Sequence, residues 1–369
     1  MEIVRNESKD RFNILHAKYL KRCLDLLPPS LATLDVSRLT IAFFAISGLD
    51  LLDCLHLIEA QKQDIIEWIY SLQILVTKTE GEERGRHGFR GSGANGVDNP
   101  YDCGNLAMTY CALSSLLILG DDLKRVDKKA IINGLREHQL SDGSFVPVIY
   151  EKENDMRFVY CATTVSYILN DWSAIDRQKT ISFIRNSLVG IDTSVVVMSE
   201  LIVGLLCEQS YECGFGQSPG LESHGGSTYC ALAALTLMDE LSALSDRQLA
   251  SMKRWCLLRQ TNGFQGRPNK DADTCYSFWL GGALKLIDGF QLMNTESNTS
   301  FILETQDMIT GGLAKYPDSI PDPMHTYLGL SALALNPNKN SLLSVNPALN
   351  ISERAVQHLN QLHSQWRDN

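Results

Sequence analysis

The pattern of hydrophobic and polar positions predicts pairs of helices. In 246–260 apolar residues recur at helical spacing, and the stretch stops at Asn262 and Gly263, a common helix end. The stretch 275–287 is apolar nearly all round, which is typical of a buried helix. Similar pairs occur at 127–140 with 158–169 and at 300–308 with 326–335. Because alternating strand patterns are almost absent, we expect an all-α fold with amphipathic outer helices and apolar inner ones.

Two short marks recur along the chain at intervals of about 50 residues. One is a glycine turn followed by a large apolar residue, and it occurs at 88–89, 143–145, 214–215, 263–264 and 312–313. The other is a tyrosine that opens an apolar helix, at Tyr110, Tyr160, Tyr229, Tyr276 and Tyr327. A fixed period indicates a repeat architecture in which no unit buries its apolar face alone. About six such helix pairs would close into one α/α barrel domain over 1–369.

One interval exceeds the period by about 20 residues, and the excess coincides with 188–209, the most apolar run in the chain. Asp192 and Glu200 inside this run argue against a membrane span. An extra buried or partner-facing helix and an insertion that packs poorly remain as alternatives. We interpret 188–209 as an atypical apolar insertion whose function the sequence does not show.

Composition narrows the class of protein. The balance of 33 basic against 43 acidic residues gives a net charge of −10 without a basic run, which argues against nucleic-acid binding. The ten cysteines lack framework spacing, and several lie in apolar helical patterns, so they predict buried free thiols in a reducing compartment. These are Cys54, Cys111, Cys161, Cys230 and Cys256. We find no secretory or lipidation signal and no transmembrane segment, and we expect a cytoplasmic protein.

Candidate chemistry lies at the starts of the last inner helices. Asp273 and Cys275 offer an oxygen and a thiolate two residues apart, and Zn²⁺ accepts both. His325 lies two residues before the last tyrosine mark. If the repeats are equivalent, these side chains meet at one mouth of the barrel. Three protein ligands would leave the fourth tetrahedral position open, the pattern of a catalytic zinc.

Each of these residues also has an ordinary structural interpretation. Taken singly, Asp273 is a helix cap, Cys275 a buried thiol and His325 a hydrogen-bonded core residue. Arg267 and Lys270 precede the Asp-x-Cys pair, and two cations beside a phenol suit a polyphosphate, although such cations usually lie on a solvated face. The common repeat phase of the three candidate ligands favours the metal site.

Longer motifs carry a resemblance to a known family. They are SRLTIAFFAISGLDLLD (37–53), NDMRFVYCA (154–162), GLESHGGSTYCALAAL (220–235), GRPNKDADTCYSFW (266–279) and the region around PDPMHTYLGL (321–330). Over nearly its whole length the chain resembles the β subunits of protein prenyltransferases, most closely those of type I geranylgeranyltransferases. The run 188–209 departs from the family pattern.

The resemblance implies an α/α toroid whose apolar funnel takes an isoprenoid, and a heterodimer with a helical α subunit. It implies one Zn²⁺ on Asp273, Cys275 and His325, with the cysteine of a C-terminal CaaX motif in the open position. Substrates of this kind include small GTPases of the Rho, Rac and Rap types. The bound thiolate would attack C1 of geranylgeranyl diphosphate.

The resemblance also assigns residues to the isoprenoid diphosphate. The diphosphate-binding positions are His224, Arg267, Lys270 and Tyr276, with Gly225 and Gly226 allowing close approach of the backbone. The positions lining the lipid pocket are Arg157, Tyr160, Cys230 and Trp279, and we count Pro268, Asn269, Ser277 and Phe278 with the binding residues.

Three positions bear on the choice of lipid and metal. Thr40 stands where the farnesyl-transferring relatives carry tryptophan, so it leaves room for a fourth isoprene unit. Leu328 is aliphatic where relatives tend to carry an aromatic residue, which also suits a wider pocket. Lys315 falls where the farnesyl enzymes carry an aspartate associated with Mg²⁺. Since its ammonium can itself neutralise diphosphate, we expect Lys315 to act in catalysis and Mg²⁺ not to be required.

Other functions remain open. The nearest alternatives are the farnesyl and Rab-type β subunits. A terpene cyclase would share the toroid, but Asp271-Ala-Asp273-Thr lacks the last aspartate of a DxDD motif and Asp121-Asp122-Leu-Lys-Arg fails DDxxD. A non-catalytic toroid would serve as a scaffold and would purify without stoichiometric zinc.

Overall fold

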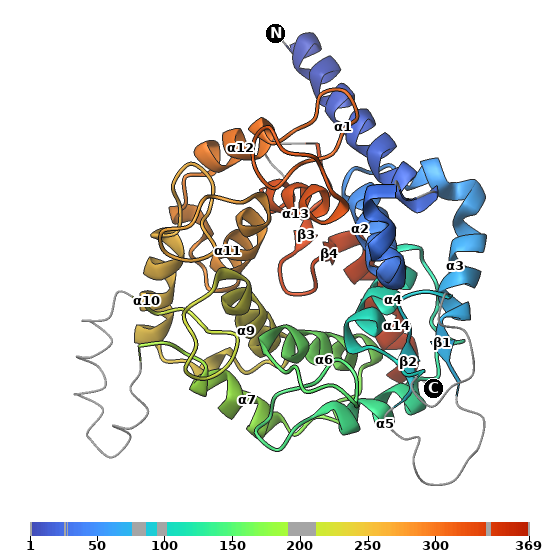
Figure 1. The fold of residues 1–369 in the computed structure, drawn as a ribbon, viewed down its shortest axis with the longest axis vertical. Coiled ribbons are helices and arrows are strands. Elements are labelled where there is room, and N and C mark those ends of the chain that lie inside the picture. The colour runs from blue at the N-terminus through green and yellow to red at the C-terminus, as the bar shows by residue number, and fades with distance from the viewer. Residues whose placement is uncertain are drawn as a thin grey trace.

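The computed structural model describes residues 2–25, 27, 29–75, 86–93, 102–190, 212–336 and 341–367. Six apolar helices form a closed ring, with each helix packed on the next and the last packed on the first (Figure 1). These inner helices are α2 (Arg38–Leu51), α4 (Leu106–Ile118), α6 (Met156–Leu169), α9 (Gly225–Leu237), α11 (Thr274–Leu286) and α13 (Pro323–Ala334). The predicted all-α barrel is confirmed.

More polar helices cover the ring from outside. They are α1 (Glu2–Asp25), α3 (Lys62–Ser71), α5 (Lys128–His138), α7 (Arg177–Asn186), α10 (Asp246–Leu257) and α12 (Thr295–Glu304). Short 3₁₀ turns join them, namely η1 (Pro29–Ser37), η2 (Leu55–Gln61), η5 (Leu241–Ala243) and η6 (Phe290–Leu292). The described strands are two-residue pairs, β1 (Gln73–Ile74) with β2 (Gly88–Phe89) and β3 (Val345–Asn346) with β4 (Ile351–Ser352). The helix pairs expected from the sequence are present, with ends shifted by a few residues.

The inner helices share one way of starting. Each of five begins at a residue whose side chain accepts a hydrogen bond from the first turn, which satisfies a backbone N–H that the helix leaves open. The capping residues are Asn105, Asp155, His224, Asp273 and Asp322. Counting from these caps corrects the repeat phase. The fifth residue after each cap is Tyr110, Tyr160, Tyr229, Phe278 and Tyr327, so Phe278 and not Tyr276 is the equivalent of the other tyrosines.

The fifth residues after the caps tie neighbouring inner helices together. The ring centroids of Tyr110 and Tyr160 lie 5.7 Å apart, and those of Tyr160 and Tyr229 lie 5.5 Å apart. Phe43 of α2 joins the same belt, since its ring lies 5.2 Å from that of Tyr110 and 5.5 Å from that of Tyr327. Edge-to-face aromatic contacts of this kind stabilise the core beyond their buried area. Phe43 therefore aligns α2 with the other inner helices.

In two repeats a hydrogen bond joins the glycine turn to the threonine that precedes the recurrent tyrosine. The hydroxyl oxygen of Thr109, four residues after its cap, accepts from the backbone N–H of Phe89 at 3.0 Å, and Thr228 accepts from Phe215 at 2.9 Å. A Cβ atom at Gly88 would lie 2.6 Å from the Thr109 hydroxyl, and one at Gly214 2.9 Å from that of Thr228. The glycine of each turn is therefore required by this close approach.

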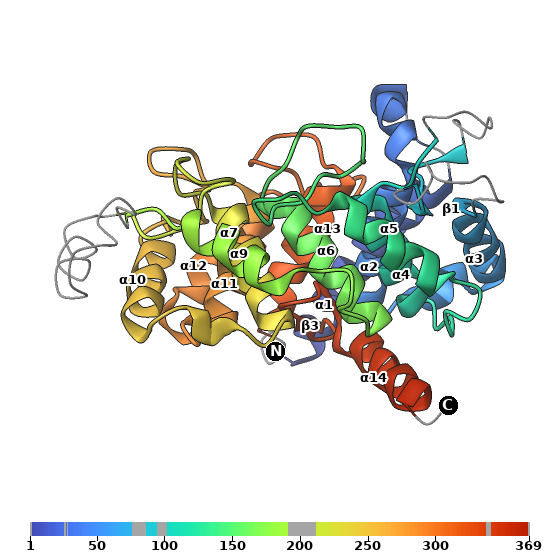
Figure 2. The same cartoon turned by 90° about the horizontal axis from the view of Figure 1, so that it is seen from below.

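The C-terminal segment closes one end of the ring. Helix α14 (Glu353–Arg367) projects from that end (Figure 2). Arg354 and Ser352 both contact the buried carboxylate of Asp50 in α2, each at 2.5 Å. His358 and His363 bond to the carbonyl oxygens of Asp121 and Ile168, at the carboxyl ends of inner helices, where cations and donors are favourable. The C-terminal segment thus forms hydrogen bonds to α2, to α6 and to the turn that follows α4.

Two apolar segments stand out by their composition, the run at 188–209 and the stretch Ala32–Leu51. Of the insertion at 188–209, residues 191–209 lie outside the described residues, so the structure of that part stays untested. Among the described residues one stretch, Ala32–Leu51, is long and apolar enough to cross a membrane by length and composition. This is weak evidence, because half of that window is buried and core helices pass the same test.

We expect Thr228→Val to lower the free energy of unfolding by about 1–2 kcal/mol, because the buried N–H of Phe215 loses its acceptor. Urea unfolding followed by circular dichroism measures the change. Thr228→Ser keeps the hydroxyl and is the matched control. A valine variant as stable as the serine variant would show that the turn does not depend on this bond.

Candidate active site

The three candidate metal ligands meet at the starts of two neighbouring inner helices. Asp273 is the cap of α11, Cys275 lies in its first turn and His325 lies in the first turn of α13. All three are buried, and their ligand atoms lie within 4.8 Å of one another. Asp273 thus precedes the helix, and Cys275 is its second residue. The two side chains converge because the Asp273 carboxylate folds over the helix end and accepts from the Cys275 N–H at 2.9 Å.

His325 is held by a residue that sequence reasoning missed. Its Nδ1 lies 2.5 Å from Oδ2 of Asp322, and Asp322 Oδ1 also accepts from the His325 backbone N–H at 3.0 Å. This contact orients the ring so that Nε2 lies 3.3 Å from Asp273 Oδ1. Carboxylates commonly hold the second nitrogen of a metal-binding histidine in this way. The sequence carried a signal for Asp322, because Pro323 follows it at the first helical position.

The ligand cluster has strongly shifted pKa values. Burial alone would lower the pKa of His325, but its hydrogen bonds to Asp273 and Asp322 outweigh burial and raise it to about 9. Burial and the neighbouring Asp273 carboxylate raise the pKa of the Cys275 thiol well above its usual value. One sulfur, one nitrogen and one oxygen in a buried pocket are a donor set that suits Zn²⁺. Zinc binds such ligands deprotonated, so its binding would release protons.

A second polar group adjoins the first through successive residues of α11. The hydroxyl of Tyr276, next to Cys275, lies 2.8 Å from His224 Nε2. His224 caps α9, and its Nδ1 accepts from the Ser227 N–H at 3.3 Å, so Nε2 carries the ring proton and donates to the phenol. Burial, and secondarily the charge of Arg267, lower the pKa of His224. A Cβ atom at Gly266 would lie 2.1 Å from the Tyr276 ring, so only glycine there lets the ring approach.

Cations border this second group. Arg267 pairs with Glu222, another residue that sequence reasoning missed, and both side chains are well exposed to solvent. They line a cavity of about 300 Å³ together with Gln217, Leu221 and His224. Pro268, Asn269 and Lys270 follow on the same exposed turn. Lys315 approaches from the other side, with its Nζ 3.7 Å from Asp273 Oδ2.

The backbone around these residues brings them close to each other. The Gly225 N–H donates to the carbonyl oxygen of Gly266 at 2.8 Å, which joins the start of α9 to the turn before α11. A Cβ atom at Gly225 would lie 3.0 Å from the Tyr276 ring. Gly226 follows in the first turn of α9. The structure therefore brings together His224, Gly225, Arg267 and Tyr276, four of the residues that the resemblance assigns to a diphosphate.

The lumen side of each inner helix can be located from the positions that contact the outer layer. Position four after the cap bonds to the outer turns, and positions two and six lie about 200° away round the helix. Arg157, Cys230, Trp279 and Leu328 occupy positions two or six of their helices, and Thr40 matches position two when α2 is aligned by Phe43. This places the five residues on the lumen side. Arg157 is half exposed there and pairs with Asp155 and Glu153.

Other predicted binding residues lie elsewhere on their helices. Tyr160 and Phe278 belong to the aromatic belt at position five. Ser277, at position four, donates to Asn298 of α12 at 2.8 Å, so the structure turns it toward the outer layer and away from the polar groups at the mouth.

The fold is an α/α barrel, and one mouth carries a candidate metal-binding triad and a group of hydrogen-bonding and cationic side chains. The prenyltransferase α–α toroid domain model matches residues 13–351, and the chain belongs to this family. It is 39% identical to the geranylgeranyl transferase type-1 subunit beta of Dictyostelium discoideum, covering 92% of this chain and 95% of that one. The Arabidopsis thaliana protein of the same name is 38% identical over 89% of this chain and 85% of that one.

A solved structure shows the same fold. The protein geranylgeranyltransferase-I of Candida albicans complexed with GGPP superposes with a TM-score of 0.82 at 28% identity, covering 95% of this chain and 98% of that one. The resemblance inferred from the motifs is therefore confirmed by the family model, by the relatives and by the fold.

Replacing Cys275 by alanine should remove stoichiometric zinc from the purified protein, because two remaining ligands hold zinc poorly. Metal analysis by mass spectrometry measures the zinc content. Cys256→Ala, which removes an equally buried thiol of α10, should leave it unchanged. Asp322→Asn should weaken zinc affinity by about 10–100-fold because the His325 ring loses its orienting carboxylate. Full zinc content in Cys275→Ala would disprove the ligand assignment.

Proposed function

We propose that this chain is the β subunit of a type I protein geranylgeranyltransferase and transfers a geranylgeranyl group to the cysteine of C-terminal CaaX motifs. One observation carries the proposal. The triad of Asp273, Cys275 and His325 adjoins the anion-binding group of His224 and Tyr276 through consecutive residues of α11. A thiol nucleophile and a diphosphate leaving group would therefore be held side by side.

The metal side of the site activates the acceptor. Zinc on Asp273, Cys275 and His325 would lower the pKa of an acceptor thiol and present it as thiolate. Asp322 keeps Nδ1 of His325 occupied, so Nε2 is the nitrogen left for the ion. Burial of all three ligands excludes competing water from the metal centre.

The cationic side of the site receives the leaving group. The Tyr276 phenol accepts the N–H of His224 and offers its own O–H, and Arg267, Lys270 and Lys315 offer positive charge near the same mouth. As the bond between C1 and the diphosphate oxygen breaks, negative charge grows on that oxygen and these donors stabilise it. Arg267 would exchange Glu222 for the diphosphate, with the planar guanidinium suited to two parallel hydrogen bonds.

The inward positions suit the longer lipid. Thr40 is small and half-buried on the inward face of α2, and its Oγ1 lies 3.3 Å from the sulfur of Met108, a flexible side chain that can move aside. A tryptophan at this position would fill the space that Thr40 leaves. We therefore assign Thr40 to the choice of a C20 over a C15 donor, with Leu328 as a second lumen-facing position.

The proposal includes a partner and a location. The chain would act as one domain in a heterodimer with a prenyltransferase α subunit, in the cytoplasm, on CaaX proteins such as small GTPases. The names of the relatives support a β subunit. The GGPP held in complex by the solved neighbour supports a geranylgeranyl donor.

Prenyl transfer by the chain co-expressed with its α partner tests the proposal. A peptide ending in CaaL is the acceptor, and geranylgeranyl or farnesyl diphosphate is the donor. We expect C20 transfer that needs zinc and is unaffected by magnesium. Preferred C15 transfer stimulated by magnesium would identify a farnesyl enzyme instead, and zinc-free protein without transfer would identify a scaffold.

Replacing Lys315 by aspartate should create a magnesium requirement. The ammonium near Asp273 is lost, and a carboxylate in its place can hold Mg²⁺ against the diphosphate. We expect the rate without magnesium to fall by about tenfold or more and to recover as Mg²⁺ is added. Lys129→Asp, at an exposed position in the first turn of α5, controls for charge reversal away from the site. An unchanged magnesium profile in Lys315→Asp contradicts the role given to this lysine.

A further inference from the structure

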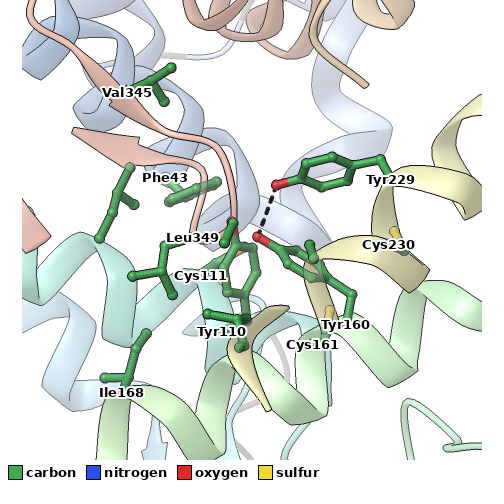
Figure 3. Packing of buried hydrophobic residues seen from close by; sticks show 14 of the residues in the cluster. Phe43, Tyr110, Cys111, Tyr160, Cys161, Ile168, Tyr229, Cys230, Val345 and Leu349 are labelled. Atoms are coloured by element: carbon green, nitrogen blue, oxygen red, sulfur yellow. Dashed lines mark hydrogen bonds between the residues drawn. The ribbon is translucent and has the colours of Figure 1, made fainter. Parts of the chain in front are cut away.

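Lys315 occupies a position that recurs in the repeat. The second residue after the large apolar residue of a glycine turn accepts a hydrogen bond from the backbone N–H of the first residue of an inner helix. The pairs are Leu106 with Pro147 at 2.9 Å, Met156 with Gln217 at 2.9 Å, Gly225 with Gly266 at 2.8 Å and Thr274 with Lys315 at 3.1 Å. Figure 3 shows three of these helices in their common phase, with Tyr110, Tyr160 and Tyr229 turned toward one another. A contact made at the last pair alone therefore needs a reason other than the fold.

The first such contact is made by the side chain of Thr274. Its hydroxyl donates to the carbonyl oxygen of Ala314 at 2.7 Å and lies 3.2 Å from that of Lys315. The equivalent helix starts carry no side-chain donor, since they are Leu106, Met156 and Gly225. Thr274 is completely buried and lies between the candidate ligands Asp273 and Cys275. It therefore ties the backbone of Lys315 to the metal ligands through both its N–H and its hydroxyl.

The second contact comes from His16 of the N-terminal helix α1. Its Nδ1 accepts a hydrogen bond from the Gly312 N–H at 2.9 Å. In the turns at 143, 214 and 263 the glycine N–H bonds to an acceptor nearby in the sequence, which is Leu140, Ser223 or Asn262. Burial lowers the pKa of His16 to about 4, so the ring is neutral at neutral pH and Nδ1 keeps its lone pair.

Stability by itself does not explain a histidine at position 16. The side chain is completely buried, and its Nε2 has no hydrogen-bond partner among the residues that the structure describes. A buried donor without an acceptor costs free energy, whereas an apolar side chain at the same place would not carry this cost. What the histidine adds is the acceptor for Gly312.

Helix α1 also packs closely on the turn that leads to Lys315. Arg22 donates to the carbonyl oxygen of Thr310, and a Cβ atom at Gly312 would lie 3.1 Å from the Tyr19 ring. The turn is thus fixed by α1 at one end, and Thr274 fixes the other end. Because a lysine stem is flexible, a fixed backbone decides how often its ammonium lies where Nζ is found, 3.7 Å from Asp273 Oδ2.

We propose that Thr274 and His16 are positioning residues for Lys315, and that the N-terminal helix thereby belongs to the support of the active site. This rests on the proposed function, in which the Lys315 ammonium stabilises the charge of the leaving diphosphate. Neither residue touches the substrate. Each acts by holding the backbone of the segment 312–315 in place.

Removing the Thr274 hydroxyl tests the contact nearest to Lys315. Thr274→Val keeps the shape of the side chain, and kcat for geranylgeranyl transfer should fall by about tenfold because the ammonium is less well placed. Zinc content should stay stoichiometric, since all three candidate ligands remain. Thr274→Ser should restore kcat. Thr109→Val, which removes an equivalent turn contact in α4, should leave kcat unchanged. Loss of zinc from Thr274→Val would show that Thr274 supports the ligands and would overturn its role at Lys315.

Two substitutions of His16 test the contact made by α1. His16→Leu removes the acceptor for the Gly312 N–H and should lower kcat by about threefold to tenfold, again with zinc retained. His16→Asn keeps an acceptor oxygen close to the place of Nδ1 and should restore most of the loss. Equal kcat values for the two variants would overturn the role of His16.

A second background separates positioning from general support of the fold. In Lys315→Ala the ammonium is absent, so adding Thr274→Val or His16→Leu should lower kcat no further. A residue that acts only through stability would lower kcat by the same factor in both backgrounds. Such additive effects would overturn the proposal.

Binding of inorganic pyrophosphate to the zinc-loaded heterodimer, measured by calorimetry, gives the same comparison without turnover. Lys315→Ala, Thr274→Val and His16→Leu should each weaken binding by about fivefold, and the double variants should bind no more weakly than Lys315→Ala. This result together with absence of prenyl transfer would refute the enzymatic function and leave the positioning roles standing. Transfer by the native heterodimer with additive losses of pyrophosphate binding would do the opposite. A native heterodimer that binds no pyrophosphate would overturn both.

Discussion

The capping of the inner helices is the interaction on which both the barrel and its mouth depend. A helix leaves its first N–H groups without acceptors, and in an apolar ring no solvent reaches all of them. Asn105, Asp155, His224, Asp273 and Asp322 supply the acceptors, each from the same position of its repeat. Three of these caps also belong to the candidate active site. Asp273 therefore serves at once as an ordinary cap and as a candidate metal ligand, because its carboxylate has two oxygens.

In this double use the helix itself positions the candidate ligand. The Asp273 carboxylate is hydrogen-bonded to the first turn of its own helix without an ion. Asp322 likewise holds the ring of His325 through a contact of 2.5 Å. The Gly-Phe turns bind the outer layer to position four, and the aromatic belt binds neighbours at position five. Positions two and six remain for the lumen. In each repeat, therefore, one side of the inner helix contacts the outer layer, one contacts the neighbouring inner helices and one is left for the lumen.

Much of this could be predicted from the chain. The repeat period, the helix pairs and the triad followed from patterns, because apolar periodicity and capping are local in sequence. The repeat phase at Tyr276 was wrong by two residues, since the true equivalent is a phenylalanine and the pattern had followed tyrosine. Glu222 and Asp322 were missed because nothing in their own neighbourhood shows which partner they meet. Arg267 lies 45 residues from Glu222.

The sequence by itself determined the class of fold, the repeat and the residue types at the mouth, because these depend on spacing along one chain. Tertiary structure alone decided which residues meet. Closure of α13 on α2 brings residues hundreds of positions apart into one core, and the C-terminal segment reaches back to Asp50. The contact of the Tyr160 ring with those of Tyr110 and Tyr229 likewise depends on the rotation of α6 against its neighbours. Packing sets that rotation, and no local pattern encodes it.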